Sequence, residues 1–175
     1  MMPELKGTRT AEFVHVSAGS TFEAFFEAEN GALFRRMWLI TGSRAEAEEI
    51  MQEAFLRLLP RWERIGALTD PSGYLYRTAF NVLRSRARRT RLALKKIVSP
   101  EQEGDEFAAA EARHVLAGAM RTLSTRQRAA LVLTELLGFE APEAGRLLGV
   151  RPSTVRSLAS QGRAAIRRTL GAQDD

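Results

Sequence analysis

The chain has 175 residues, of which 45% are hydrophobic and 27% are charged, a composition typical of a folded globular protein. It has no cysteine, which excludes a disulfide framework, a thiolate nucleophile and a cysteine-based zinc site. No apolar run approaches the ~20 residues of a transmembrane helix, and the N-terminus has no secretory signal pattern. We therefore expect a cytoplasmic protein.

The net charge of +5 hides an uneven distribution. Residues 1–63 carry ten acidic side chains against seven basic ones, whereas residues 77–98 carry eight basic side chains and no acidic one. Residues 141–170 carry six arginines against the single Glu143. Two separate basic stretches of this kind indicate contact with a polyanion, as in nucleic-acid binding.

Helical periodicity begins after a leader, residues 1–20, that we expect to be mobile. Apolar residues at helical spacing predict a first helix from Phe22 to Gly42. Ser43 and Glu46 form a capping-box pattern that opens a second helix. The core-facing stripe of this helix is predicted to comprise Ala47, Ile50, Met51, Ala54, Phe55, Leu58, Leu59 and Trp62.

A third helix is predicted from the turn at Asp70 and Pro71 through the first basic stretch. The acidic, proline- and glycine-containing run that follows is the best linker candidate, which we place at residues 95–110. No alternating strand pattern is long enough to propose a sheet. We predict an all-α protein with two small helical domains, residues 21–94 and 111–170, joined by a flexible linker and followed by a tail, residues 171–175.

The polar side of the second helix is acidic. It presents Glu46, Glu49, Gln52 and Glu53. Phosphate would be repelled by these carboxylates, so the face is predicted to meet a protein partner. The alternative is an ordinary solvated helix face.

The third helix carries a basic face, because Arg77, Asn81, Arg84, Ser85 and Arg88 recur at helical spacing. The aromatic residues Tyr74, Tyr76 and Phe80 are interleaved with it. Arginine beside aromatic rings suits unstacked bases better than closed duplex DNA. The alternative is that these rings pack in the core.

The C-terminal part has the helix lengths and the glycine-containing turn of a helix-turn-helix. A short helix is predicted at 142–148, a turn at 149–152 and a longer helix at about 153–170. In the longer helix Val155, Ala159, Gly162 and Ile166 are predicted to face inward. The outward residues, which could meet DNA bases and phosphates, are Ser153, Thr154, Arg156, Ser157, Ser160 and Gln161. The alternative is a plain helical hairpin with a solvated basic face.

Several stretches together resemble the extracytoplasmic-function sigma factors of the sigma-70 family. Residues 43–58 resemble conserved region 2.2, and residues 71–81 are similar to regions 2.3 and 2.4. Residues 123–128 with 131–133, and residues 148–150 with 154–157, resemble region 4. The resemblance extends from about Phe22 to Leu170. It implies an alternative sigma factor that binds core RNA polymerase and directs promoter recognition, DNA melting and transcription initiation.

The resemblance also implies roles for the predicted faces. Core-polymerase binding falls to Glu46, Glu49, Gln52 and Glu53, and contact with the melted minus 10 element to Arg77, Asn81, Arg84 and Arg88. Contact with the duplex minus 35 element falls to Thr154, Arg156, Ser157, Ser160 and Gln161. Arg151, Leu158 and Gln161 depart from the usual family residues, so we expect weak or unusual minus 35 recognition. Many members have an anti-sigma partner, which makes an anti-sigma factor a further candidate partner.

Two other functions fit part of the sequence. A stand-alone helix-turn-helix regulator explains residues 111–170, and a helical adaptor would need no DNA contact. An enzyme fits poorly, because the sequence has no H-E-x-x-H helix, no glycine-rich phosphate loop and no nucleophile elbow. His15 and His114 are far apart in sequence. We expect no catalytic residue, no metal and no cofactor.

Overall fold

The computed structural model describes residues 20–93 and 118–171, with side chains up to residue 89 in the first range. The regular elements in these ranges are all helices, which confirms the all-helical fold class. Apart from Ser20 and Gly171, the predicted leader, linker and tail lie outside the described residues.

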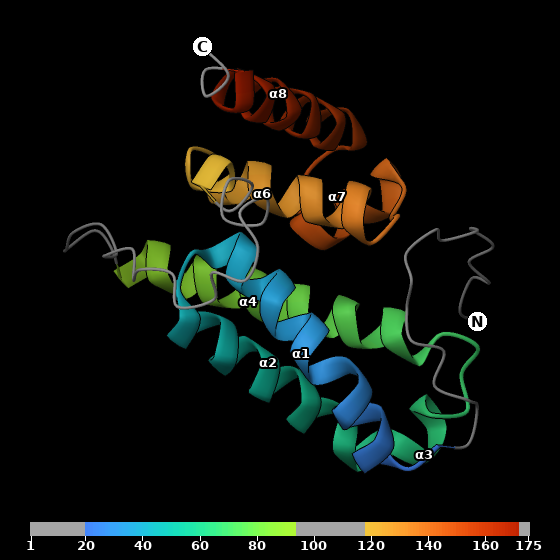
Figure 1. The fold of residues 1–175 in the computed structure, drawn as a ribbon. Coiled ribbons are helices and arrows are strands. Elements are labelled where there is room, and N and C mark those ends of the chain that lie inside the picture. The colour runs from blue at the N-terminus through green and yellow to red at the C-terminus, as the bar shows by residue number, and fades with distance from the viewer. Residues whose placement is uncertain (1–19, 94–117, 172–175) are drawn as a thin grey trace.

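The helices form two units, one from each part of the chain (Figure 1). The N-terminal unit comprises α1 (Phe22–Thr41), α2 (Arg44–Leu58), the 3-10 turn η1 (Leu59–Arg61), α3 (Trp62–Ile65) and α4 (Pro71–Ala93). The C-terminal unit comprises α6 (Thr125–Leu131), the π-helical turn η3 (Val132–Leu136), α7 (Ala141–Leu148) and α8 (Pro152–Gly171). In the C-terminal unit α8 packs on both α6 and α7.

Local side-chain caps set the ends of the first two helices. The Thr21 hydroxyl accepts a hydrogen bond from the Ala24 amide at 3.2 Å, and Gly42 ends α1 with a left-handed φ of 74°. The Ser43 hydroxyl accepts from the Glu46 amide at 3.3 Å, as predicted. The return bond of the capping box is absent, because the Ser43 amide donates to the Thr41 hydroxyl instead.

A complete capping box opens α6. The Ser124 hydroxyl accepts from the Gln127 amide at 3.3 Å, and the Gln127 side-chain oxygen accepts from the Ser124 amide at 2.9 Å. Both bonds satisfy amides that a helix start would otherwise leave without a partner. The beginning of α6 is therefore fixed by its own sequence.

Five residues of the predicted apolar stripe, Ala47, Ile50, Ala54, Phe55 and Leu58, are buried, and Met51 and Trp62 are partly buried against the core. Leu59 is 49% exposed, because the chain tightens into η1 before Pro60 and the helical phase changes there. Trp62 keeps its inward position, with its ring centroid 4.6 Å from that of Phe25 and 5.5 Å from that of Phe22. This aromatic group closes the far end of the N-terminal unit.

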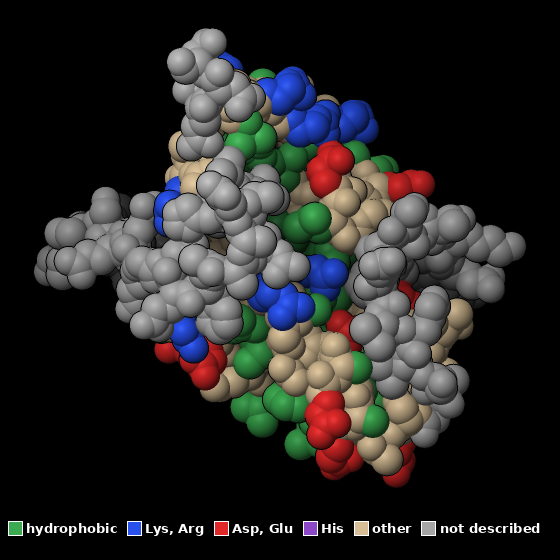
Figure 2. All heavy atoms as spheres, viewed as in Figure 1, with side chains coloured by type: hydrophobic (Ala, Val, Ile, Leu, Met, Phe, Trp, Pro, Cys, Tyr) green, Lys and Arg blue, Asp and Glu red, His purple; other side chains and the backbone are tan. Residues whose placement is uncertain are grey.

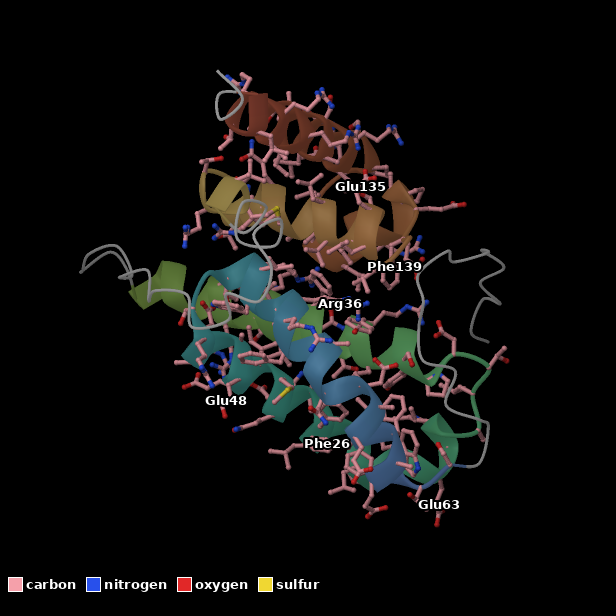
Figure 3. The ribbon with its side chains drawn as sticks, in the orientation of Figure 1. Phe26, Arg36, Glu48, Glu63, Glu135 and Phe139 are labelled. Carbon is pink, nitrogen blue, oxygen red and sulfur yellow. The ribbon has the colours of Figure 1, made fainter. Side chains whose placement is uncertain are left out.

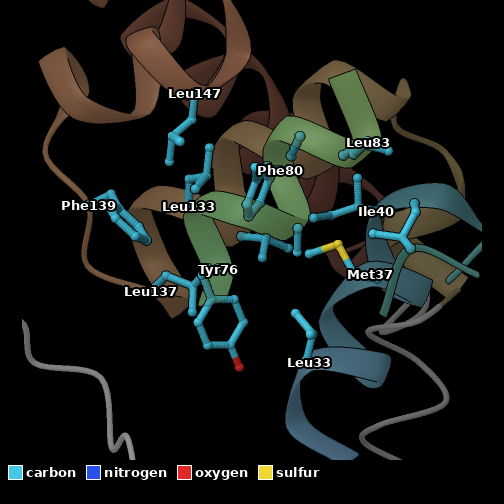
Figure 4. Packing of buried hydrophobic residues seen from close by; sticks show 14 of the residues in the cluster. Leu33, Met37, Ile40, Tyr76, Phe80, Leu83, Leu133, Leu137, Phe139 and Leu147 are labelled. Atoms are coloured by element: carbon cyan, nitrogen blue, oxygen red, sulfur yellow. The ribbon is translucent and has the colours of Figure 1, made fainter. Parts of the chain in front are cut away.

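A single cluster of buried apolar side chains runs through both units. Between them, α1 packs on α6 and α4 packs on α7. Figure 4 shows Tyr76 and Phe80 of α4 among Leu133, Leu137 and Phe139 of the C-terminal unit. The two units therefore share a hydrophobic core, a contact that the sequence did not predict.

In the part of the chain that the structure describes, no helix combines the length and the apolar character that crossing a membrane would require.

Candidate functional site

The acidic face of α2 is less uniformly solvated than the sequence predicts. Glu49 and Gln52 are exposed, but Glu46 and Glu53 are half-buried. Burial raises the pKa of Glu46. Figure 3 shows that Glu48, a neighbour in the same helix, projects from the outer side of α2. Two carboxylates of the acidic face, those of Glu46 and Glu53, are therefore partly shielded from solvent by the rest of the protein.

Arg86 of α4 reaches across to this acidic face. Its guanidinium donates to a carboxylate oxygen of Glu49 and, at 3.1 Å, to Oε2 of Glu53. The other oxygen of Glu53 pairs with Arg57 at 2.5 Å. Burial alone would raise the pKa of Glu53, but the hydrogen bonds from Arg86 and Arg57 outweigh it and lower that pKa. Arg86 thus holds two acidic side chains in place.

The basic face of α4 is divided between solvent and the C-terminal unit. Asn81 and Arg88 are exposed. Arg77 is half-buried and forms an ion pair with Glu143 of α7 at 2.7 Å. Arg84 is exposed, yet its Nη1 donates to the Arg146 carbonyl at 3.2 Å. Two of the four predicted DNA-contacting residues on α4 are therefore engaged by the C-terminal unit.

The aromatic residues of α4 do not form a stacking surface. Tyr76 is fully buried and Phe80 is 1% exposed, whereas Tyr74 is partly buried. The Tyr76 hydroxyl accepts a hydrogen bond from Arg36, and burial raises the pKa of that hydroxyl. For Tyr76 and Phe80 the structure favours the core-packing alternative over contact with unstacked bases.

The helix-turn-helix forms as predicted from α7, a tight turn and α8. Gly149 ends α7 with a φ of 68°. In α8 Val155, Ala159 and Gly162 are buried, and Ile166 is partly buried. The six residues predicted to point outward are all exposed: Ser153, Thr154, Arg156, Ser157, Ser160 and Gln161.

Local hydrogen bonds order part of this outward face. Gln161 donates from Nε2 to the Ser157 hydroxyl at 3.2 Å, and its side-chain oxygen accepts from Gln127 at 3.4 Å. Figure 2 shows Lys and Arg side chains gathered over α8. The outward face of α8 is therefore an accessible basic surface, and the opposite side of the same helix is apolar and buried.

The sequence did not identify three of the residues that shape these surfaces. Arg86 and Glu143 pair with side chains distant in sequence, and Arg128 is only 6% exposed. In the sequence, each of these three residues has the pattern of an ordinary charged residue on the solvent side of an amphipathic helix. No local signal distinguishes such a charge from one that bridges two helices.

Both halves of the chain match families of sigma-70 domains. Residues 25–92 match Sigma-70 region 2, and residues 113–166 match Sigma-70, region 4. The chain is similar to the sigma factor SigL of Mycobacterium tuberculosis H37Rv, with 28% identity over 97% of this chain and 96% of SigL. It is 31% identical to SigC of M. tuberculosis CDC 1551, over 85% of this chain and 82% of SigC.

Among solved structures, the fold is similar to that of the sigma factor RpoE of Bartonella quintana, solved in complex with the anti-sigma factor NepR. The TM-score is 0.62 at 20% identity, over 86% of this chain and 96% of that one. The chain belongs to the extracytoplasmic-function sigma factors of the sigma-70 family, with a region 2 and a region 4 domain.

Membership of this family establishes the general function. The protein is a sigma factor of transcription initiation that binds DNA through region 4, and it is not an enzyme. Sigma factors bind core RNA polymerase. A stand-alone regulator would leave the region 2 match over residues 25–92 unexplained, and an adaptor without DNA contact would leave the region 4 match unexplained.

Proposed function

We propose that three surfaces divide the work of promoter recognition. The acidic face of α2, with Glu46, Glu49, Gln52 and Glu53, binds core RNA polymerase. The basic face of α4, with Arg77, Asn81, Arg84 and Arg88, contacts the melted minus 10 element. The N-terminal half of α8, with Thr154, Arg156, Ser157, Ser160 and Gln161, contacts the duplex minus 35 element.

The observation that carries this proposal is the two-sided character of α8. All five proposed minus 35 residues are exposed, while Val155 and Ala159 between them are buried against the C-terminal unit. A recognition helix needs this arrangement, because its inner side must dock on the domain while its N-terminal outer side enters the major groove. Arginine suits guanine edges and phosphates, and glutamine suits adenine.

Apolar residues beside the acidic face support a protein partner for α2. Leu56 is 67% exposed and Leu59 is 49% exposed, and both follow closely on Gln52 and Glu53 in the chain. Exposed apolar groups with polar residues around them are typical of protein interfaces rather than of nucleic-acid contacts. The same carboxylates would be repelled by DNA phosphates.

Run-off transcription tests the proposed function as a whole. Purified chain and core RNA polymerase would be incubated with a random promoter library, and transcripts would be sequenced to recover the templates used. We expect initiation from a subset of templates that share minus 10 and minus 35 sequences. No chain-dependent initiation from any template would contradict the proposal.

Charge reversal on α2 tests the polymerase contact separately. Glu49→Arg should weaken binding to core RNA polymerase roughly tenfold, because it places a cation where the proposed partner surface meets an anion. Glu63→Arg is the matched control, since Glu63 is an exposed carboxylate on α3, outside the proposed face. Equal affinities of the two variants for core polymerase would exclude Glu49 from the contact.

We further propose an anti-sigma factor as a regulatory partner, with the cytoplasm as the place of action. The support is that the structurally similar RpoE was solved in complex with an anti-sigma factor. A tagged chain isolated from its host should then yield a complex that lacks polymerase and that releases active chain when dissociated. Recovery of the chain with core polymerase alone would contradict this part of the proposal.

A further inference from the structure

A chain of side-chain hydrogen bonds ties the outward face of α8 to the start of α6. It runs from Ser124 through Gln127 and Gln161 to Ser157. One end is a backbone amide in the capping box of α6. The other end is an exposed hydroxyl on the face that we propose contacts the minus 35 element.

The capping box fixes the orientation of the Gln127 side chain. A backbone N–H can only donate, so the atom of Gln127 that meets the Ser124 amide at 2.9 Å is its oxygen, Oε1. The Ser124 hydroxyl donates to the same oxygen at 3.1 Å. The nitrogen of the Gln127 amide therefore faces away from the cap and toward α8.

This orientation passes on to Gln161. Nε2 of Gln127 donates to Oε1 of Gln161 at 3.4 Å, so Gln161 presents its oxygen on that side. Nε2 of Gln161 then donates to the Ser157 hydroxyl at 3.2 Å. Each bond dictates the direction of the next, because an amide side chain donates only from nitrogen and accepts only at oxygen.

Ser157 is thereby left as a donor. Its oxygen accepts from Gln161, and among the residues that the structure describes no acceptor takes its proton. Thr169 of the same helix differs, because its hydroxyl donates to the Ala165 carbonyl at 3.1 Å, four residues earlier. The exposed hydroxyl of Ser157 can therefore donate to a partner outside the protein.

Gln161 keeps its own capacity for base contact. Its Nε2 has a second hydrogen and its Oε1 a second lone pair, which are the donor and the acceptor that adenine requires. The chain of hydrogen bonds thus orders Gln161 and Ser157 before DNA binds, and this lowers the conformational entropy that binding must cost.

We propose that Gln127 is a positioning residue for minus 35 recognition, and that it sets Ser157 to donate to an acceptor on a base edge. The inference rests on the minus 35 role proposed for Ser157 and Gln161. In the major groove guanine presents the acceptors N7 and O6 and thymine presents O4, whereas cytosine presents the N4 donor. Ser157 then favours guanine or thymine over cytosine at the base that it faces.

Transcription from a promoter library measures this preference. The full chain and core RNA polymerase would transcribe templates randomised only across the minus 35 region, each identified by a barcode in its transcribed part. Ser157→Ala locates the base, since only there should the preference for guanine over cytosine disappear. In the wild type we expect a guanine-to-cytosine ratio of roughly five at that position, as for one net hydrogen bond.

Gln127→Glu should invert the chain. Glutamate keeps the capping box, but both of its oxygens only accept, so the Gln161 amide must turn its nitrogen toward position 127 and its oxygen toward Ser157. Ser157 then donates inward and offers lone pairs to DNA. The guanine-to-cytosine ratio should fall roughly tenfold below that of the wild type, because donor and acceptor have changed places.

Arg126→Gln is the matched control for charge. It makes the same change of charge at the neighbouring exposed position of α6, and it should leave the guanine-to-cytosine ratio as in the wild type. The proposal is refuted if Gln127→Glu shows the ratio of the control. A fall in total transcription with no shift in this ratio also refutes it, because Gln127 would then serve only to cap α6.

Failure of the proposed function can be recognised separately. If the wild type shows no base preference anywhere in the minus 35 region, the minus 35 role of α8 fails, and the role of Gln127 fails with it. If Arg156→Ala alters the minus 35 preference but neither Ser157→Ala nor Gln127→Glu does, the minus 35 role stands and only the inference about Gln127 is refuted.

Discussion

At the scale of single residues, buried charges do most to distinguish this structure from a generic helical bundle. Glu29 is 2% exposed and its Oε1 accepts a hydrogen bond from the Ser72 hydroxyl at 2.6 Å. This bond joins α1 to the first turn of α4 inside the N-terminal unit. Desolvation by burial raises the pKa of Glu29 despite the nearby Arg36.

The raised pKa predicts a specific pH dependence of stability. A carboxyl whose pKa is higher in the folded than in the unfolded state stabilises the fold most when protonated. The contribution of Glu29 is therefore present below its ordinary pKa, about 4.3, and is lost as pH rises through the raised value. Relative to Glu29→Gln, the wild type should lose stability as pH rises.

Urea unfolding of both proteins across this pH range checks the prediction. Glu27→Gln serves as the control, because Glu27 is an exposed glutamate on the same helix. A stability difference between wild type and Glu29→Gln that stays constant with pH would contradict the account of Glu29.

Residue-level prediction from the sequence succeeded where helical spacing alone decides exposure. The exposure of the outward residues of α8, and of Asn81 and Arg88 of α4, follows directly from the helical period of about 3.6 residues per turn. The engagement of Arg77 by Glu143 does not, since it depends on how two separate units pack. The same holds for Arg86 over the acidic face of α2.

At the scale of elements, helix boundaries were predictable where caps are local. Thr21, Ser43 and Ser124 each accept a hydrogen bond from an amide three residues ahead. The inward assignment of Leu59 was wrong, because η1 interrupts the helical period at that point. Periodicity predicts a face only as far as the helix remains regular.

The helix-turn-helix gives the sharpest prediction at this scale. A Cβ on Gly145 of α7 would lie 2.8 Å from the Val150 carbonyl oxygen in the turn before α8. That neighbour is backbone and cannot move without displacing α8, so Gly145→Ala should destabilise the protein by about 1–3 kcal/mol, a cost typical of overpacking.

Thermal unfolding compares this variant with Gly171→Ala, where an added Cβ meets nothing within 4 Å. The control should match or slightly exceed the wild type, because alanine is the better helix former. A midpoint for Gly145→Ala at or above that of the control would contradict the role given to this close approach.

At the scale of the whole molecule, the shared core makes the two units depend on each other. The sequence predicted two small domains, and both family matches agree with two regions. It gave no sign of their contact, because the apolar residues involved, such as Phe80 and Leu137, read as the core of their own unit. Association of domains depends on surface complementarity that periodicity does not contain.

Cooperative unfolding follows from this shared core. Trp38 and Trp62 are the two tryptophans of the chain, and both lie in the N-terminal unit. Urea unfolding followed by tryptophan fluorescence reports on that unit, while far-ultraviolet circular dichroism reports on all helices. We expect coincident transitions. A helical transition that occurs clearly before the fluorescence change would show that the C-terminal unit unfolds independently.

We propose that this chain reads promoter DNA as part of a complex with core RNA polymerase and opens the minus 10 element there. Permanganate reactivity of unpaired thymines, on a promoter selected by run-off transcription, tests this claim most directly. We predict reactive thymines near minus 10 when chain and core polymerase are both present, and none with either one alone. Reactivity with the chain alone, or no reactivity with both, would contradict the account.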